Sequence, residues 1–369
     1  MPTLETIARQ QLEKLEKTAK KRVLSPGFQN DALYLEENGR RYLSFASNDY
    51  LALSAHPEVI ASAKAALEKY GAGATASRLV AGNHPLYAEL ETALAAYKGM
   101  ESALVFGSGY LTSLGVIPAL VGRGDVIIAD RLAHACMLDG AKNSGAVLKR
   151  FRHNDLAHLE MLLKEFRGRY RHCLVLTEHV FSMDGDLAPL AAIKTICDMH
   201  DAWLMSDDAH GLAPADTKPH LLMGTLSKSL GSYGGYIAGP KTVIDYLQSS
   251  ARSLIFSTGL PPSVIAAAST ALKIAKAEPV RGKKALENAQ RFTKALHLPA
   301  AQSAIVPVIL GDAQKALAAS AQLKADSFFV PAIRPPTVPE GSARLRFSFT
   351  AAHEDAHMEK IIEAMRKWQ

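Results

Sequence analysis

The residues with the clearest chemical potential are a lysine, a histidine and an aspartate close together in the chain. Lys228 lies among small residues and hydroxyls in the segment Gly224–Gly231, and Asp207 and His210 come just upstream, after an apolar run. Pyridoxal 5'-phosphate (PLP) needs such a set: a lysine amine for a Schiff base, a carboxylate that keeps the pyridine nitrogen protonated, and hydroxyls and amides for the phosphate. Their order along two apolar strands favours a cofactor site over an unrelated surface lysine and turn.

A second group of residues is suited to binding a phosphate. Ser108, Gly109 and Tyr110 lie between a predicted strand and a predicted helix. Glycine lets backbone amides approach an anion, and a helix N-terminus favours negative charge by about 0.3–1 kcal/mol. A tight turn without a ligand has the same pattern. The glycines of Gly71–Ala76 follow a helix rather than a strand, so we do not expect a dinucleotide site there.

Further polar residues follow or occupy predicted strands. His134 and Ser182 each follow a strand end, where ligands bind in α/β sheets. An imidazole at that place either stacks on a planar ring or caps a helix. Arg344 and Arg346 share one face of a short C-terminal strand, and a guanidinium matches a carboxylate with two parallel hydrogen bonds. A surface salt bridge is the alternative for these arginines.

Composition indicates an ordinary globular protein. The chain has 369 residues, of which 48% are hydrophobic and 21% charged, which predicts two or three domains. The net charge of +6 is spread along the chain, so we expect no nucleic-acid partner. A small positive excess suits an anionic small-molecule substrate. Three cysteines without CxxC spacing predict reduced thiols in the cytoplasm and no metal site.

The sequence gives no sign of a membrane segment or signal peptide. The first residues are charged throughout and lack an apolar core. The uncharged run Ser102–Gly122 is long enough to span a bilayer, but it contains four glycines after Phe106 and one proline. A buried strand, a turn and a helix explain this run better than a membrane span.

The pattern of elements predicts an α/β protein. Helices are expected over Leu4–Arg22, Pro57–Tyr70 and Leu86–Lys98, and a β-hairpin around Asn38-Gly39. Apolar strands then alternate with helices, which favours a largely parallel, doubly wound sheet covered on both faces. The expected strands are Ala103–Phe106, Val126–Ala129, Cys173–Thr177, Trp203–Met205, Leu221–Met223 and Tyr236–Ala238.

The pattern changes again near Leu260. Alanine-rich helices lead to short strands at Ile305–Leu310 and Arg344–Phe349 and to a last helix at His353–Trp368. We therefore expect three parts: an N-terminal arm with a helix and a hairpin (1–45), a large PLP-binding domain (46–258) and a small α+β C-terminal domain (259–369).

The chain resembles the α-oxoamine synthases, PLP-dependent transferases of fold type I, nearly from end to end. The segments that carry the resemblance are Ser47–Leu51, Ala76–Gly82, Gly107–Tyr110, Asp130–His134, Phe181–Asp186, Asp207–Gly211, Gly224–Gly231, Ile255–Thr258, Ile333–Pro339 and Ala343–Arg346. The resemblance implies a mainly parallel seven-stranded large domain, a smaller C-terminal domain, PLP as cofactor, and a homodimer with active sites at its interface. One departure is the segment Gly211–Ser227, which is shorter than is usual in the family.

The resemblance also implies roles for individual residues. Lys228 would bind the cofactor and move the α-proton of the amino acid. Asp207 would pair with the pyridine nitrogen, His134 would stack on the ring, and His210 would bind its phenolic oxygen. The remaining cofactor contacts would be Gly109, Tyr110, Ser182, Thr225 and Ser227, with Ser257 or Thr258 reaching the partner subunit's phosphate. The substrate contacts would be Arg22, Asn48, His134, Arg346 and Thr350.

The resemblance is strongest to the branch that condenses L-alanine with a pimeloyl thioester in biotin biosynthesis, releasing CO2 and a thiol. The thioester would be pimeloyl-CoA or a pimeloyl carrier protein. A glycine-using synthase of aminoketobutyrate or aminolevulinate is the alternative within the family, and a non-catalytic subunit of the same fold is another. A serine hydrolase built on Ser108, His134 and Asp207 would leave Lys228 without a role.

Overall fold

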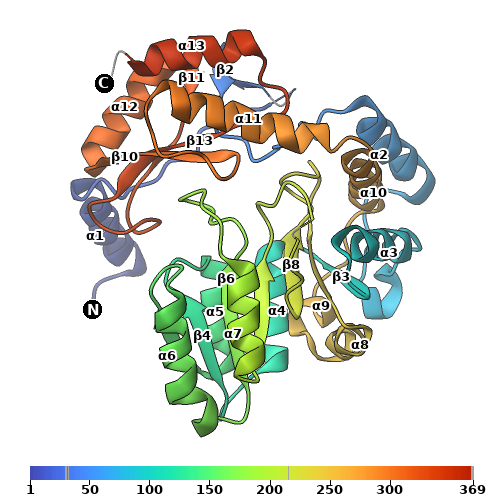
Figure 1. Cartoon of the computed structure of the whole chain (residues 1–369). Helices are drawn as coiled ribbons and strands as arrows, with labels where there is room; N and C mark the ends of the chain where they lie inside the picture. Colours follow the sequence, from blue (N-terminus) through green and yellow to red (C-terminus); the bar gives the residue numbers. More distant parts are fainter. Residues whose placement is uncertain (30, 32, 215, 367–369) are drawn as a thin grey trace. The chain divides into compact units, whose positions relative to one another are not determined.

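The computed structural model describes residues 1–29, 31, 33–214 and 216–366, and they form two compact units (Figure 1). The larger unit comprises Asn48–Ser182 and Asp186–Lys284. The smaller unit comprises Met1–Ser47, Met183–Gly185 and Ala285–Gln369. The division therefore falls after Lys284 rather than after residue 258, because the helix that follows residue 258 is buried in the core of the larger unit.

The larger unit is built on a seven-stranded sheet of order β3-β9-β8-β7-β6-β4-β5. Only β9 runs antiparallel to its neighbours, so the prediction of a mainly parallel seven-stranded sheet is confirmed. The edge strand β5 was not predicted, because Lys149 and Arg150 interrupt its apolar residues. The strands are β3 (Ser102–Phe106), β4 (Val126–Asp130), β5 (Val147–Phe151), β6 (Cys173–Glu178), β7 (Trp203–Asp207), β8 (Leu221–Thr225) and β9 (Gly235–Gly239).

Helices cover both faces of this sheet, as expected for a doubly wound fold (Figure 1). Alternate residues of β4, β6 and β7 point to opposite faces, so each face has its own apolar core. One face packs against α4 (Gly109–Leu120), α5 (Ala135–Ser144), α8 (Lys241–Ser250) and α9 (Arg252–Ile255). The other packs against α6 (Leu156–Phe166) and α7 (Leu190–Met199), and, over β3, β8 and β9, against α2 (Pro57–Tyr70), α3 (Leu86–Lys98) and α10 (Pro262–Ala277).

The smaller unit contains two three-stranded sheets, β1-β2-β11 and β10-β13-β12. Its hairpin turns at Asn38 and Gly39, both with positive φ, as the Asn-Gly pair predicts. The first helix ends at Lys17 rather than at Arg22, and the predicted end of the last helix at Trp368 lies outside the described residues. The elements are α1 (Leu4–Lys17), β1 (Tyr34–Glu37), β2 (Arg40–Ser44), β10 (Ile305–Gly311), α12 (Ala313–Ala325), β11 (Phe328–Phe329), β12 (Ala332–Ile333), β13 (Ala343–Ser348), α13 (Asp355–Arg366) and, from Ala285 onward, α11 (Val280–Ala295).

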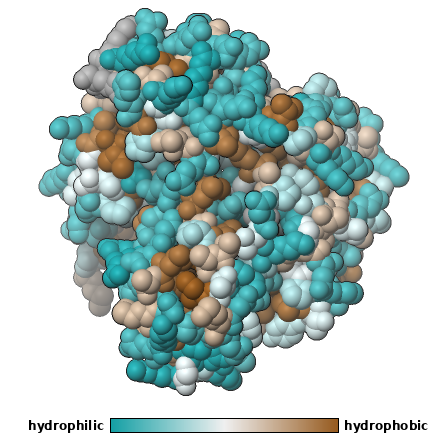
Figure 2. All heavy atoms as spheres, in the orientation of Figure 1, coloured by the Kyte–Doolittle hydropathy of each residue, from teal (hydrophilic) through white to brown (hydrophobic). Residues whose placement is uncertain are grey.

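Within the described part of the chain, no helix combines the length and apolar character that a membrane crossing requires. The uncharged run Ser102–Gly122 forms β3 and α4, as predicted. The face of the molecule in Figure 2 is mostly hydrophilic, with separate apolar patches.

Candidate active site

The candidate site lies at the carboxyl ends of the parallel strands in the larger unit. Glu178 ends β6, Asp207 ends β7 and Thr225 ends β8. Glu178 lies directly beside Asp207 in the register of the sheet. Because ligands of open α/β sheets bind at this edge, these residues are placed where a cofactor is expected.

Lys228 belongs to a chain of hydrogen bonds that runs through His210. Its Nζ lies 2.7 Å from Nε2 of His210, and Nδ1 of His210 lies 2.7 Å from the hydroxyl of Tyr50. The Tyr50 hydroxyl donates its single proton to Oδ1 of Asn48, 3.0 Å away. His210 must then donate from Nδ1 to Tyr50, so in the neutral ring Nε2 is the acceptor that faces Lys228. Tyr50 was not among the predicted site residues, because its only signal was its place near Asn48.

Asp207 is a buried carboxylate close to Lys228 and His134. Only 4% of the residue is exposed, and its Oδ1 accepts a 2.8 Å hydrogen bond from the backbone N–H of Ala209. Burial raises the pKa of Asp207, and the charge of Lys228, followed by that of His134 when it is protonated, opposes that rise. Ligand atoms of Asp207, His134 and Cys136 all lie within 4.8 Å of one another, so the fold brings two of the predicted site residues together.

His134 both caps a helix and faces the site. Its Nδ1 accepts the backbone N–H of Cys136 at 3.2 Å as the N-cap of α5. Burial lowers the pKa of His134, so the ring is neutral and carries its proton on Nε2. The capping interpretation is therefore correct, and the cap fixes the plane of the ring beside Asp207.

The turn before α4 has the form expected of a phosphate site. Ser108 caps α4, so its side chain binds the N–H of Leu111 and leaves the first amides of the helix for another partner. The backbone of Gly235 on β9 passes so close that a Cβ there would lie 2.3 Å from the nitrogen of Gly109. Thr225, the register partner of Gly235, is also close, since a Cβ added at Gly109 would be 3.7 Å from that of Thr225.

Two hydroxyls and a tyrosine complete this turn. Thr225 Oγ1 donates to the carbonyl of Gly234 at 2.8 Å and lies 2.7 Å from Oγ of Ser227. Tyr110 donates to Oδ2 of Asp139 at 2.5 Å, and this hydrogen bond raises the pKa of Tyr110. Its ring is thereby tied to α5.

The residues present fit PLP. A desolvated carboxylate such as Asp207 requires a positive partner, which a protonated pyridine nitrogen supplies. His134 offers a neutral planar ring within 4.8 Å of that carboxylate. The α4 N-terminus offers backbone N–H donors for a phosphate, while the Thr225 hydroxyl beside it already donates to the carbonyl of Gly234.

Ser182 lies in a turn just after β6, and the last residue of that strand, Glu178, fixes the turn by a hydrogen bond. The backbone N–H of Ser182 donates to Oε2 of Glu178 at 3.1 Å, and both residues are buried. Glu178 was not predicted as a site residue, because a single acidic residue at a strand end has no distinctive sequence signal.

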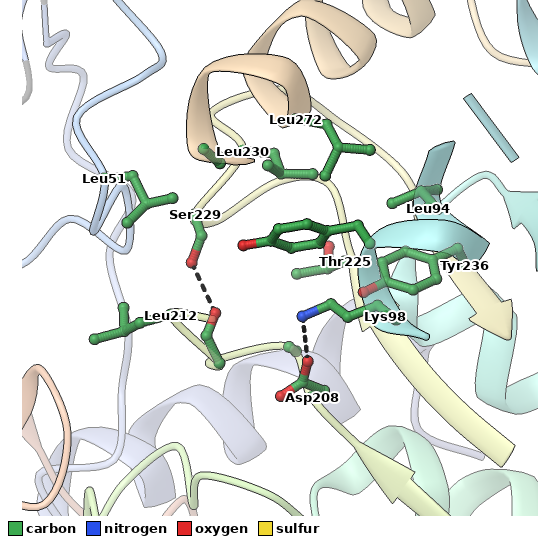
Figure 3. Close-up of a pocket in the computed structure, with 14 residues that line it drawn as sticks. Leu51, Leu94, Lys98, Asp208, Leu212, Thr225, Ser229, Leu230, Tyr236 and Leu272 are labelled. Atoms are coloured by element: carbon green, nitrogen blue, oxygen red, sulfur yellow. Dashed lines mark hydrogen bonds and ion pairs between the residues drawn. The ribbon is translucent and has the colours of Figure 1, made fainter. Parts of the chain in front are cut away.

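A buried ion pair supports the loop that carries His210. Lys98 on α3 binds Oδ2 of Asp208 at 2.6 Å (Figure 3). His179 lies 2.7 Å from Oδ1 of Asp208. Burial opposes the charge on Lys98, but Asp208 outweighs it and raises the pKa of the amine. Burial also opposes the charge on Asp208, while Lys98 and His179 lower the pKa of the carboxylate. The cavity beside this pair measures about 30 Å³, which has room for water rather than for a substrate.

A second ionic contact joins two loops of the site. His153 lies with Nδ1 3.0 Å from Asp130 and Nε2 2.8 Å from Asp186. Burial disfavours the protonated form of His153, but the hydrogen bonds to Asp130 and Asp186 outweigh this effect and raise the pKa of His153 to about 10. Asp130 precedes the segment with His134, and Asp186 follows the turn with Ser182. The protonated His153 ring therefore links the segment that follows Asp130 to the turn that precedes Asp186.

The other predicted substrate residues belong to the smaller unit. Arg22 donates a hydrogen bond at 2.7 Å to Oγ1 of Thr337, in the proline-rich loop Ile333–Pro339. Arg346 donates to Oγ of Ser348 at 2.7 Å. Thr350 is fully buried. Arg344, by contrast, forms a 2.6 Å ion pair with Asp184, so the salt-bridge interpretation holds for this arginine.

Comparisons with known proteins extend over nearly the whole chain. Residues 40–365 match the family Aminotransferase class I and II. An 8-amino-7-oxononanoate synthase from Methylobacterium sp. (strain 4-46) is 54% identical over 366 residues, which cover 98% of this chain and 96% of that protein.

Two solved structures share the fold. A serine palmitoyltransferase from S. paucimobilis with bound PLP–myriocin has a TM-score of 0.91 at 27% identity and covers 99% of this chain and 98% of its own. A serine palmitoyltransferase from Sphingomonas wittichii has a TM-score of 0.90 at 31% identity, with coverages of 99% and 96%. Both units of the chain take part in these similarities.

Proposed function

The chain belongs to the class I and II aminotransferase family and is a PLP-dependent acyltransferase of fold type I, and from this premise we propose that it makes 8-amino-7-oxononanoate for biotin biosynthesis. L-Alanine and a pimeloyl thioester are its substrates. A bond forms between Cα of alanine and the acyl carbonyl carbon, the C–S bond breaks, and the alanine carboxylate leaves as CO2. The observation that most strongly supports the proposal is the buried Asp207 beside neutral His134, in a chain 54% identical to a synthase of this name.

PLP, when bound, supplies an electron sink that stabilises negative charge at Cα of the amino acid. Asp207 would hold the proton on the pyridine nitrogen, and His134 would present its neutral ring to the face of the cofactor. Lys228 Nζ would anchor the cofactor and move the Cα proton. His210, fixed with Nδ1 toward Tyr50, presents Nε2 as an acceptor beside Lys228.

Selection of the acyl chain rests on the smaller unit. A pimeloyl group ends in a carboxylate, which needs a cation. Arg22 contacts the proline-rich loop by donating a hydrogen bond to Thr337. Its neighbours in the chain are held as well, since Lys20 forms an ion pair with Glu340 and the carbonyl of Lys21 accepts a hydrogen bond from Arg334. We assign the distal carboxylate to Arg22; for the amino-acid carboxylate, the family resemblance implies Asn48, Arg346 and Thr350.

The proposed assembly is a homodimer in the cytoplasm. Large apolar side chains are exposed on one short segment and beside α9: Leu79 at 57%, Val80 at 81% and Phe256 at 70%. A second copy of the chain would cover them, with Ser257 or Thr258 reaching the partner subunit's phosphate. The buried cysteine thiols are consistent with a reducing compartment.

Release of free thiol with L-alanine and different acyl-CoA donors tests the proposal. We expect pimeloyl-CoA to exceed acetyl-CoA and succinyl-CoA in kcat/KM. Arg22→Ala should lower kcat/KM for pimeloyl-CoA by about 10–100-fold, as expected for a lost charge-assisted hydrogen bond, and leave acetyl-CoA unaffected. The control is Arg9→Ala, which removes an exposed arginine from α1. Equal use of the three donors by the wild-type protein would contradict the assignment of the acyl substrate.

A further inference from the structure

Glu178 is a buried carboxyl group to which the proposed reaction gives no task. It lies beside Asp207 in the parallel register of β6 and β7, and neighbouring residues in register point to the same face. The side chains of Glu178 and Asp207 continue the rows of Leu176 and Met205, which face α4 and α5. Two carboxyl groups are thus placed next to each other on the buried side of the sheet.

The surroundings of the two groups differ. Asp207 accepts the N–H of Ala209 and has Lys228 as a cationic neighbour. Glu178 is 2% exposed, and its Oε2 accepts the N–H of Ser182. Its Oε1 has no hydrogen-bond partner within residues 1–29, 31, 33–214 and 216–366, and no Lys or Arg of that part of the chain forms an ion pair with it.

The charges that act on Glu178 are mostly negative. Asp207 and Asp130 disfavour its ionised form, while the hydrogen bond from the Ser182 N–H and the charge of Lys228 favour it. Burial, the largest cause, and the charge of Asp207 raise the pKa of Glu178 well above its usual value. When two carboxyl groups share a buried place, one of them keeps a proton.

We propose that Glu178 is a positioning residue that keeps the proton of the Glu178–Asp207 pair, so that Asp207 alone carries the negative charge facing the cofactor nitrogen. Since Oε2 accepts the N–H of Ser182, the proton resides on Oε1. Glu178 thereby holds the Ser182 turn without adding a second anion to the site. The inference rests on the proposed function only in taking Asp207 as the partner of the pyridine nitrogen.

Infrared difference spectra of the cofactor-loaded protein without substrate test this protonation state. Near neutral pH, the difference between wild type and Glu178→Gln should contain the carbonyl stretch of a protonated carboxylic acid, shifted when glutamate carries ¹³C in its side chain. Glu160→Gln is the matched control, because Glu160 is paired with Lys164 and should lose a carboxylate band instead. A carboxylate band lost from Glu178 as well would overturn the proposal.

The pH titration of the cofactor absorbance gives a second readout. Glu178→Gln replaces a neutral acid by a neutral amide that can still accept the Ser182 N–H, so the midpoint should stay at the wild-type value. Glu178→Ala removes that acceptor and should weaken cofactor binding, which Gln restores. A midpoint displaced in Glu178→Gln, as removal of a second anion would cause, contradicts the proposal. Since no substrate is present, the result is independent of whether L-alanine and a pimeloyl thioester are the true substrates.

Discussion

At the scale of single residues, the hydrogen-bond chain Lys228–His210–Tyr50–Asn48 decides which nitrogen of His210 is an acceptor. The Tyr50 hydroxyl has one proton and gives it to Asn48, so the proton of neutral His210 is held at Nδ1. Nε2 is then directed at the amine on which the proposed chemistry depends. The orientation of His210 is thus set by residues that a motif search at Asp207–Gly211 does not include.

Lys228→Ala should abolish turnover while the protein remains folded. In the proposed reaction the amine both anchors the cofactor and moves a proton, and loss of general acid–base catalysis alone is worth about 10²–10⁴-fold in rate. The mutant should also give no cofactor adduct after borohydride reduction, as mass spectrometry of the intact chain would record. A mutant that keeps both wild-type activity and the trapped adduct would show that another lysine does this work.

At the scale of elements, the end of β7 is supported from both sides. Asp207 points toward α4 and α5, while the next residue, Asp208, is held by Lys98 from α3. A strand reverses its side chains at each residue, so two adjacent aspartates serve two different partners.

Lys98→Met should therefore destabilise the larger unit. The substitution leaves the buried Asp208 carboxylate with His179 as its remaining basic neighbour among the described residues. Removing one partner of a buried ion pair lowers the free energy of unfolding by about 3–5 kcal/mol. Thermal unfolding measures this loss. The double variant Lys98→Met with Asp208→Asn should recover part of it, because the unpaired charge is then gone. A single variant as stable as wild type would show that the pair contributes nothing.

The two loops that His153 joins should loosen at high pH. The pKa of His153 rises from 6.5 to about 10 on folding, so the folded chain binds this proton more tightly than the unfolded chain. The stabilisation is then complete below about pH 6.5 and is lost as the pH rises through about 10. The Tm of wild type should exceed that of His153→Gln near pH 6.5, and the gap should narrow toward pH 10. A gap that stays constant over this range would assign the effect of His153 to packing with Phe181.

At the scale of the whole molecule, the sequence predicts the elements better than it predicts the division between units. Pro57–Tyr70 and Leu86–Lys98 are helices with the predicted bounds, because a cap or a glycine marks their ends. The division after Lys284 depends on which core buries α10, and a helix pattern does not say which core that is.

In the candidate site, too, the sequence pattern does not show which residues folding brings together. Residues in distinctive motifs, such as Asp207, His210 and Lys228, could be predicted as candidates from their order along the chain, and the fold brings His210 and Lys228 within hydrogen-bond distance. Tyr50 and Glu178 could not, because a lone tyrosine or glutamate acquires its role only from neighbours that folding brings to it. Arg344 and Arg346 had the same sequence pattern, and the ion pair of Arg344 with Asp184 became visible only in the structure.

The most direct test of the proposed reaction is a competition between amino acids. Wild-type protein is given L-alanine and glycine at equal concentration with pimeloyl-CoA, and the amino ketones are identified by mass, with Lys228→Ala as the control that should form neither. We predict that the alanine product, 8-amino-7-oxononanoate, is formed in excess. The glycine product should still be measurable, because one methyl group is worth only about 1–3 kcal/mol of discrimination. A predominant glycine product, or no condensation with either amino acid, would contradict the proposed function.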